Sequence, residues 1–283
     1  MKRYCEGGAS ACGPKNLGDG MKDDLLWRNL ASLPAFRALL RAVEARFYQD
    51  LLLPEPSLDL GCGDAHFASV TFRHQLAAGV DPWALPLREA RRLRPQTYQL
   101  LLQASGDRLP FPSGHFASAM SNSVLEHIPD LAPVLADLAR VLRPGAPFIF
   151  CVPSEYFLDF LSISGVLGRL GLSGPAQAYR AFFNRISRHH HCDAPDVWRA
   201  RLEAAGFRLE KYWYYFSPGA LRTLEWGHYF GLPSVVAHTL TGRWVMAPTA
   251  ANLALTERLV RPYYEEPLPE KGAYLFFVAR KVG

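Results

Sequence analysis

The sequence Leu-Asp-Leu-Gly-Cys-Gly-Asp-Ala at residues 58–65 decides which fold we expect. An apolar strand, two closely spaced glycines and then a helix start let the backbone approach a ligand and point helix N–H groups at it. A nicotinamide site would carry a third glycine where His66 stands. Asp59, two residues before the first glycine, would repel a pyrophosphate but suits an ammonium group. The run therefore argues against a nicotinamide-dependent oxidoreductase, and the alternative to a ligand site is a turn that Asp59 caps.

Strand-like and helix-like runs alternate after this turn. Short β-rich runs predict strands, and they lie at residues 57–60, 77–80, 98–103, 117–122, 147–152, 207–216 and 273–281. Amphipathic runs predict helices, and they lie at residues 67–75, 87–94, 131–142 and 195–205. This alternation predicts an α/β fold in which helices cover both faces of a mostly parallel sheet.

Several stretches fall outside the alternation and divide the chain. Residues 23–50 have apolar positions at helical spacing with a break at Pro34, and two aromatic-rich insertions interrupt the core. We therefore expect a flexible tail (1–22), an N-terminal helical cap (23–56), a core (57–153 and 193–217), a cap insertion (154–192), a helical insertion (218–271) and a last core strand (272–283).

Two further acids follow the next two predicted strands. Asp81 comes eighteen residues after Gly63, at a strand end where a carboxylate can accept from both hydroxyl groups of a ribose. Asp107, in the run Gly-Asp-Arg-Leu-Pro-Phe-Pro at 106–112, could accept from the exocyclic amine of adenine. An Asp-Pro turn without a ligand is the alternative for Asp81, but the spacing favours a nucleoside site.

With these motifs, the chain resembles the class I S-adenosylmethionine-dependent methyltransferases. It is most similar to the type 11, small-molecule branch that includes quinone and sterol methyltransferases. The resemblance rests on five runs, at residues 58–63, 79–81, 105–112, 124–128 and 138–145. It implies a Rossmann-like, seven-stranded sheet whose last strand is antiparallel, with helical cap insertions. It also implies that S-adenosyl-L-methionine lies across the carboxyl ends of the strands.

The resemblance further implies roles for residues that match the family's motifs. Asp59 would hold the amino group of the cofactor, Asp81 its ribose hydroxyl groups and Asp107 its adenine. The other cofactor-binding residues implied in these runs are Gly61, Cys62, Gly63, Pro82, Gly106, Arg108, Asn122 and Ser123. The acid that the family usually carries after Phe116 is Ala117 here, a departure at a structural position that leaves cofactor binding little affected.

The reaction that the resemblance implies needs little acid–base chemistry. Methyl transfer from a sulfonium is an in-line displacement, so alignment and the exclusion of water are the main contributions. Glu126 and His127 are the candidate bases nearest to the motifs, but His127 could instead order the loop before Ile128, and we assign no catalytic residue. The histidine run 189–191 has no second ligand pair at zinc spacing, so we expect no metal.

The composition and charge of the chain argue against several other classes of function. The 283 residues carry a formal charge of +5, and 49% are apolar and 20% charged, which is typical of a globular protein. The densest basic run, from Arg88 to Arg94, is short, so we do not expect nucleic-acid binding. No run reaches about 18 uninterrupted apolar residues. Five cysteines without a CxxC pair and the lack of a secretory signal lead us to expect a cytoplasmic protein.

Aromatic residues in both insertions bear on the substrate. They include Tyr156, Phe160, Trp226 and Trp244, and they suggest a small, apolar methyl acceptor, although they could equally form the core of a helical cap. An exposed apolar cap would also allow transient contact with a membrane surface. The alternative function is a non-catalytic module that binds the cofactor or a partner without turnover. The acceptor, the methylated atom and the oligomeric state stay open.

Overall fold

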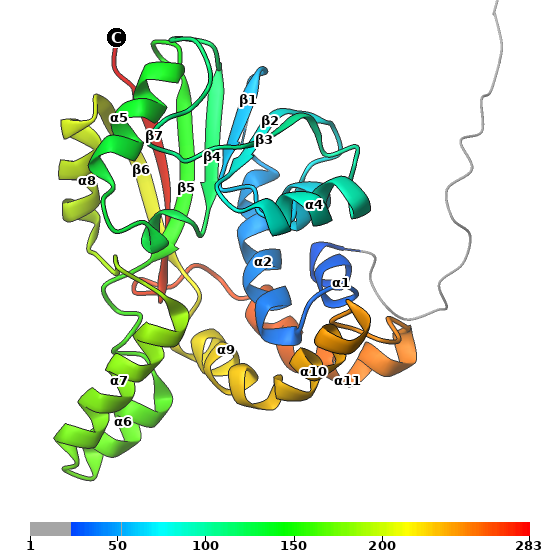
Figure 1. Cartoon of the computed structure of the whole chain (residues 1–283). Coiled ribbons are helices and arrows are strands. Elements are labelled where there is room, and N and C mark those ends of the chain that lie inside the picture. Colours follow the sequence, from blue (N-terminus) through cyan, green and yellow to red (C-terminus); the bar gives the residue numbers. More distant parts are fainter. Residues whose placement is uncertain (1–23, 52) are drawn as a thin grey trace, which may run out of the picture.

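The computed structural model describes residues 24–51 and 53–283, so the tail expected at 1–22 lies outside the described residues (Figure 1). Seven strands form one sheet in the order β3-β2-β1-β4-β5-β7-β6. Their bounds are β1 Ser57–Leu60, β2 Leu76–Asp81, β3 Tyr98–Gln103, β4 Ser118–Asn122, β5 Pro147–Pro153, β6 Phe207–Tyr215 and β7 Tyr274–Lys281. The strands β1 to β5 pair in parallel, whereas β7 runs antiparallel to both β5 and β6. The predicted mostly parallel sheet with an antiparallel last strand is therefore confirmed.

The central strand β5 shows why the sheet needs a cover on both faces. Phe148, Phe150 and Val152 belong to one hydrophobic cluster, while Ile149 and Cys151 belong to another. All five side chains are at most 2% exposed. Because side chains alternate between the faces of a strand, a continuous apolar run buries one hydrophobic layer on each side.

Four helices pack against these two layers: α3 (His66–Thr71), α4 (Ala84–Leu93), α5 (Ala132–Val141) and α8 (Pro195–Ala204). The first two contribute to the cluster on one face, and α5 and α8 to the cluster on the other. The helix predicted at 67–75 is shorter, because the chain becomes extended at Phe72 and the N–H of Leu76 joins the next strand pair by donating to Thr97. Gly206, with φ +83°, follows α8 at the predicted stop.

The other α-helices form a cap around the carboxyl ends of the parallel strands (Figure 1). They are α1 Leu25–Leu30, α2 Ala35–Tyr48, α6 Ser162–Arg169, α7 Ser173–Ser187, α9 Pro218–Phe230, α10 Leu232–Thr241 and α11 Ala250–Tyr264. Pro34 separates α1 from α2 at the predicted break, and Asp24 caps α1 by accepting from the N–H of Trp27 at 3.0 Å. Helix α2 packs against α9 and α11, while α6 and α7 form a pair that projects from the body of the molecule (Figure 1).

The cap helices are short or carry charged residues. Among the described residues, none of the helices is both long and apolar enough to cross a lipid bilayer.

Candidate functional site

Residues Gly61 to Gly63 form a tight turn over the end of β2. The N–H groups of Gly61 and Cys62 both donate to the carbonyl oxygen of Val80, at 2.8 and 3.0 Å. Gly61 has φ +83°, and a Cβ atom there would overlap the side chain of Val124. Cys62 is buried, and burial raises the pKa of its thiol. Glycine is therefore required at Gly61 both by the backbone conformation and by the close approach of a neighbouring side chain.

Three carboxylates that the sequence analysis singled out lie on adjacent strands. Asp59 is part of β1, Asp81 ends β2 and Asp107 follows β3, and these strands are neighbours in the order β3-β2-β1. Asp59 and Asp81 are 3% and 8% exposed, whereas Asp107 is exposed. The strand order thus lines up the three acids along one edge of the sheet, beside the glycine turn.

The carboxylate of Asp59 is buried against Tyr98, a residue that the sequence analysis did not identify. The Tyr98 hydroxyl donates to Asp59 Oδ2 at 2.5 Å. Burial raises the pKa of Asp59 to about 7, although the hydrogen bond from Tyr98 acts in the opposite direction. A cation placed next to Asp59 would favour the ionised carboxylate.

Asp81 ties the end of β2 to the glycine turn. Its Oδ2 accepts from the N–H of Gly63 at 3.0 Å, and its Oδ1 accepts from the N–H of Trp83 at 2.9 Å. Burial raises the pKa of Asp81, and the two backbone hydrogen bonds counteract this effect. Pro82 lies in the same turn, where its carbonyl oxygen accepts from the Gln103 side chain at 3.0 Å. The acid expected to bind ribose is therefore adjacent to the turn.

The loop after β3 carries the other residues that we expect near the adenine. Asp107 and Arg108 are exposed, and Gly106 is partly buried. Asp137 of α5, which the sequence analysis missed, holds this loop in place by accepting from the N–H of Leu109 at 2.6 Å. This contact with α5 thus helps to fix the loop on which Asp107 lies.

A buried polar network joins α2 to the end of β4. Glu44 is 0% exposed, and its Oε2 accepts from Arg41 at 2.5 Å and from the side chain of Asn122 at 2.7 Å. Its Oε1 accepts from the hydroxyl groups of Ser123 and Tyr215, both at 3.0 Å. Asn122 and Ser123 were predicted from the sequence, whereas Glu44 and Arg41 were not, because helical periodicity does not reveal which side chains a helix presents to a strand end.

His66 and Arg94 form hydrogen bonds next to the glycine turn. Arg94 Nη2 donates to His66 Nδ1 at 3.2 Å, and Arg94 Nη1 donates to the backbone oxygen of Asp64 at 2.9 Å. Because Nδ1 accepts, His66 Nε2 carries the proton and donates to Asn29 Oδ1 at 2.9 Å. Burial lowers the pKa of His66 to about 4. Arg94, the last residue of the basic run noted in the sequence, thus points toward this network.

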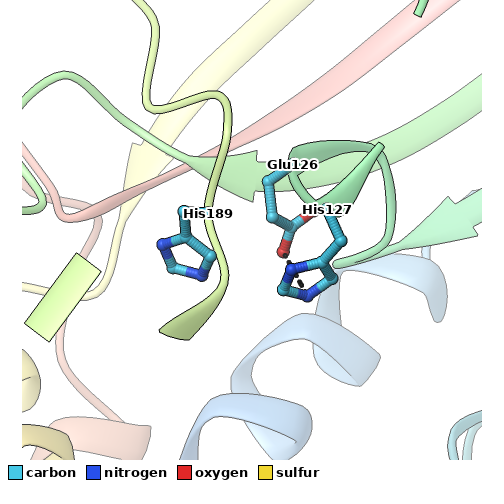
Figure 2. Close-up of side chains that lie close together, drawn as sticks. All are labelled: Glu126, His127 and His189. Atoms are coloured by element: carbon cyan, nitrogen blue, oxygen red, sulfur yellow. Dashed lines mark ion pairs between the residues drawn. The ribbon is translucent and has the colours of Figure 1, made fainter. Parts of the chain in front are cut away.

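Figure 2 shows Glu126, His127 and His189 close together, although they come from two separate segments. The first two belong to η1 (Leu125–His127), and His189 follows the end of α7. The nitrogen and oxygen atoms that could bind a metal ion lie within 4.8 Å of one another. Burial raises the pKa of Glu126 to about 8 and lowers that of His189 to about 3. From the sequence, Glu126 and His127 were candidate bases and the histidine run 189–191 was considered separately, so the approach of His189 to the other two was not predicted.

A cavity of about 430 Å³ opens beside this cluster, between α2, α9 and the end of α7. Its apolar lining includes Phe36 and Phe157, and its cationic lining consists of Arg37, Arg41 and Arg188. None of the described residues that line it is an aspartate or a glutamate. The cavity therefore combines apolar walls with an excess of positive charge.

Comparisons with known proteins agree with this geometry. Residues 58–150 match the family model described as a methyltransferase domain. Trans-aconitate 2-methyltransferase from Azoarcus sp. (strain BH72) is 31% identical over 102 residues, which cover 35% of this chain and 39% of the relative. An uncharacterized 37.1 kDa protein in transposon TN4556 of Streptomyces fradiae is 31% identical over 122 residues, which cover 38% of this chain and 35% of the relative. The chain thus spans less than half of the length of these curated relatives.

Solved structures share the fold over most of the chain. An S-adenosylmethionine dependent methyltransferase from Mesorhizobium loti has a TM-score of 0.50 at 17% identity, covering 87% of this chain and 100% of that one. Geranyl diphosphate C-methyltransferase from Streptomyces coelicolor A3(2) has a TM-score of 0.50 at 14% identity, covering 84% and 75%. The [4+2]-cyclase SpnF has a TM-score of 0.52 at 17% identity, covering 87% and 82%. At these identities the likeness shows the fold alone.

The family match and the strand order identify the class. Residues 58–150 form a methyltransferase domain, and the sheet has the strand order of a Rossmann-like methyltransferase fold. Over these residues the match is to the type 11 branch of the class I S-adenosylmethionine-dependent methyltransferases, as the sequence motifs predicted, and S-adenosylmethionine is the cofactor of that class.

Proposed function

We propose that this protein transfers the methyl group of S-adenosylmethionine to a small acceptor bound beneath the helical cap. The observation that carries the proposal is the row of three carboxylates, Asp59, Asp81 and Asp107, along adjacent strand ends beside the glycine turn. An ammonium group, a pair of ribose hydroxyls and an adenine amine are the three groups of one sulfonium nucleoside that such acceptors would bind.

In this proposal the remaining residues shape the cofactor pocket. The turn at Gly61, Cys62 and Gly63 packs on the methionine and ribose, and Pro82 borders the ribose. Gly106 and Arg108 border the adenine, and Asn122 and Ser123 lie beside the methionine. The N-terminal helices and both insertions close over the acceptor. Alignment of the acceptor with the methyl group then supplies most of the rate acceleration.

The cavity supports a refinement of the apolar acceptor that the sequence suggested. Phe36 and Ile186, which both line the cavity, would contact an apolar portion, whereas Arg37 and Arg188 would bind an anionic group such as a carboxylate or a phosphate. We therefore propose an acceptor that carries both an apolar portion and an anionic group. Trans-aconitate, in the name of the relative from Azoarcus, is a carboxylate and so matches the anionic part of this proposal.

A non-catalytic, cofactor-binding module is the alternative, and the family match does not favour it. The [4+2]-cyclase among the structural neighbours illustrates that the fold by itself does not prescribe methyl transfer. Turnover therefore has to be measured separately from cofactor binding.

Calorimetry with S-adenosylhomocysteine tests the proposal. We expect one site per chain, no binding of NAD, and roughly 10–100-fold weaker binding by Asp81→Asn, because each hydrogen bond to a charged acceptor contributes about 1.5–3 kcal/mol. Asp196→Asn, an exposed acid on α8, is the matched control. An unchanged affinity in Asp81→Asn would contradict the ribose assignment. Cofactor binding without methyl transfer to any member of a carboxylate and phosphate panel would favour the module.

Two further expectations stay predictions. Phe230 and Leu240, at 77% and 79% exposed, are apolar side chains on α9 and α10 that could contact a membrane surface transiently. Flotation of the protein with anionic liposomes would test that contact. A cytoplasmic location is likewise a prediction, for which fractionation of cells is the test.

A further inference from the structure

The cluster of Glu126, His127 and His189 has the composition of a metal site. We propose that these three side chains bind a divalent first-row transition-metal ion, with Zn²⁺ and Co²⁺ as representatives. Their candidate ligand atoms lie within 4.8 Å of one another, and Glu126 Oε1 is 3.8 Å from His127 Nε2. Zn²⁺ sits about 2.0–2.1 Å from such ligands, so modest side-chain rotations would bring all three into its coordination sphere.

Hydrogen bonds hold the two contributing segments together without using the ligand atoms. The N–H of His190 donates to the carbonyl oxygen of Glu126 at 2.7 Å. The ring nitrogen Nε2 of His191 donates to the carbonyl oxygen of Ile128 at 2.9 Å. These contacts bind the segment after α7 to η1, so the three side chains are brought together before any ion binds.

The orientation of His127 leaves a lone pair available. Its Nδ1 lies 3.0 Å from the carbonyl oxygen of Arg188, which can only accept, so Nδ1 carries the proton. His127 Nε2 therefore has the free lone pair, and it is this atom that faces Glu126. A hydrogen bond from the second ring nitrogen to a carbonyl oxygen is the usual way in which a metal-binding histidine is oriented.

The buried carboxyl group of Glu126 has one oxygen atom that lacks a hydrogen-bond partner among the described residues. Glu126 is only 1% exposed. Its atom Oε2 is buried and has no hydrogen-bond partner in the part of the chain that the structure describes. A buried carboxyl oxygen without a partner is costly, and a cation at this place would satisfy it. Arg41, whose charge lowers the pKa of Glu126, already donates to Glu44.

The ligand set favours a transition metal over Mg²⁺ or Ca²⁺. Two imidazoles and one carboxylate suit Zn²⁺, Co²⁺ or Fe²⁺, whereas Mg²⁺ and Ca²⁺ prefer oxygen ligands. Three protein ligands also leave a coordination position open. Since His189 lines the cavity, that position would face the anionic group of the acceptor, a consequence that rests on the proposed function.

Metal titration of the full-length protein tests the inference directly. Cys5 and Cys12, which lie outside the described residues, are first replaced by serine, and bound metal is removed with a chelator. We expect one equivalent of Zn²⁺ or Co²⁺ to bind by calorimetry, with weaker binding of Mg²⁺, and visible d–d absorption for Co²⁺. His189→Ala and Glu126→Gln should each weaken binding at least about tenfold. His190→Ala, the neighbouring exposed histidine, should retain the wild-type affinity.

The outcomes separate this inference from the proposed function. A protein that binds S-adenosylhomocysteine but takes up no stoichiometric Zn²⁺ would overturn the metal site alone. An equal loss of affinity in His190→Ala would place the ion on the surface histidine run instead. If the variants do not fold, the Co²⁺ spectrum of the protein with serine at positions 5 and 12 still decides, because a thiolate-to-cobalt charge-transfer band would place the ion on one of the remaining cysteines.

Discussion

The proposed cofactor half of the candidate site lies at the ends of β1, β2 and β3, and each of its parts comes from a short, continuous run of sequence. The acceptor half is assembled differently, from side chains of α2, η1 and the segment after α7. In the first half the backbone conformation places the functional groups, as at Gly61 and Asp81. In the second half, contacts between distant segments place them, as between the N–H of His190 and the carbonyl oxygen of Glu126. Substitutions should therefore affect the two halves in different ways.

The largest effect is expected at the junction of the two halves. Glu44→Ala would leave Arg41 without its carboxylate and would remove the acceptor of Asn122, Ser123 and Tyr215. Breaking a buried ion pair costs about 3–5 kcal/mol, so we expect a loss of that size in the free energy of unfolding. Chemical denaturation measures it. The exposed pair of Arg280 with Glu210 provides the control, because Glu210→Gln should cost less than about 1 kcal/mol.

A smaller loss of stability is expected in the glycine turn. Gly61→Ala adds a methyl group that overlaps Val124, and the alanine would have to adopt the left-handed backbone conformation of this position. We expect the free energy of unfolding to fall by about 3 kcal/mol. Gly63→Ala is the matched control: its φ is +53°, but no atom lies within 4 Å of the added Cβ, so about 1 kcal/mol should be lost. Denaturation curves compare the two. Val124→Ala in the Gly61→Ala background should restore part of the stability, and its failure to do so would argue against the steric cause.

In the acceptor half, Arg37→Gln should change acceptor binding without changing cofactor binding. The loss of one charge-assisted hydrogen bond predicts a KM about 10–100-fold higher for a carboxylate or phosphate acceptor, with the affinity for S-adenosylhomocysteine unchanged. Steady-state kinetics and calorimetry measure the two quantities. Arg28→Gln, an exposed arginine of α1, serves as the control. An equal rise in KM for a neutral acceptor of matched size would show that Arg37 does not recognise the anionic group.

The smallest effect is a pH dependence of cofactor affinity. Because the pKa of Asp59 is raised to about 7, its carboxyl takes up a proton as the pH falls through neutrality, and only the ionised form attracts an ammonium group. We expect S-adenosylhomocysteine to bind about tenfold more weakly at pH 6 than at pH 8. Tyr98→Phe removes a hydrogen bond that lowers this pKa and should move the transition to higher pH. Asp59→Asn should bind weakly at both pH values, and a retained pH dependence in this variant would assign the titration to another group.

How much of the site the sequence could predict depends on the kind of residue involved. The turn at Gly61 and the acid Asp81 were predictable, because strand ends, glycine spacing and turn residues act over a few neighbouring positions. Tyr98 carried no such signal: in the sequence it is one residue of a predicted strand. The sequence showed Arg94 only as the end of a basic run, since charge spacing along a helix does not indicate which way its last side chain turns.

The sequence by itself determined the α/β class, the strand that carries the glycine turn, and the acids that follow the next strands, since periodicity and turn chemistry are local properties of the chain. Only the tertiary structure decided that Glu44 reaches Asn122 and Ser123, that His189 lies beside Glu126 and His127, and that arginines from two helical segments surround one cavity. The physical reason is that an amphipathic pattern specifies which face of a helix is buried, whereas the packing of the whole chain selects the partner for that face.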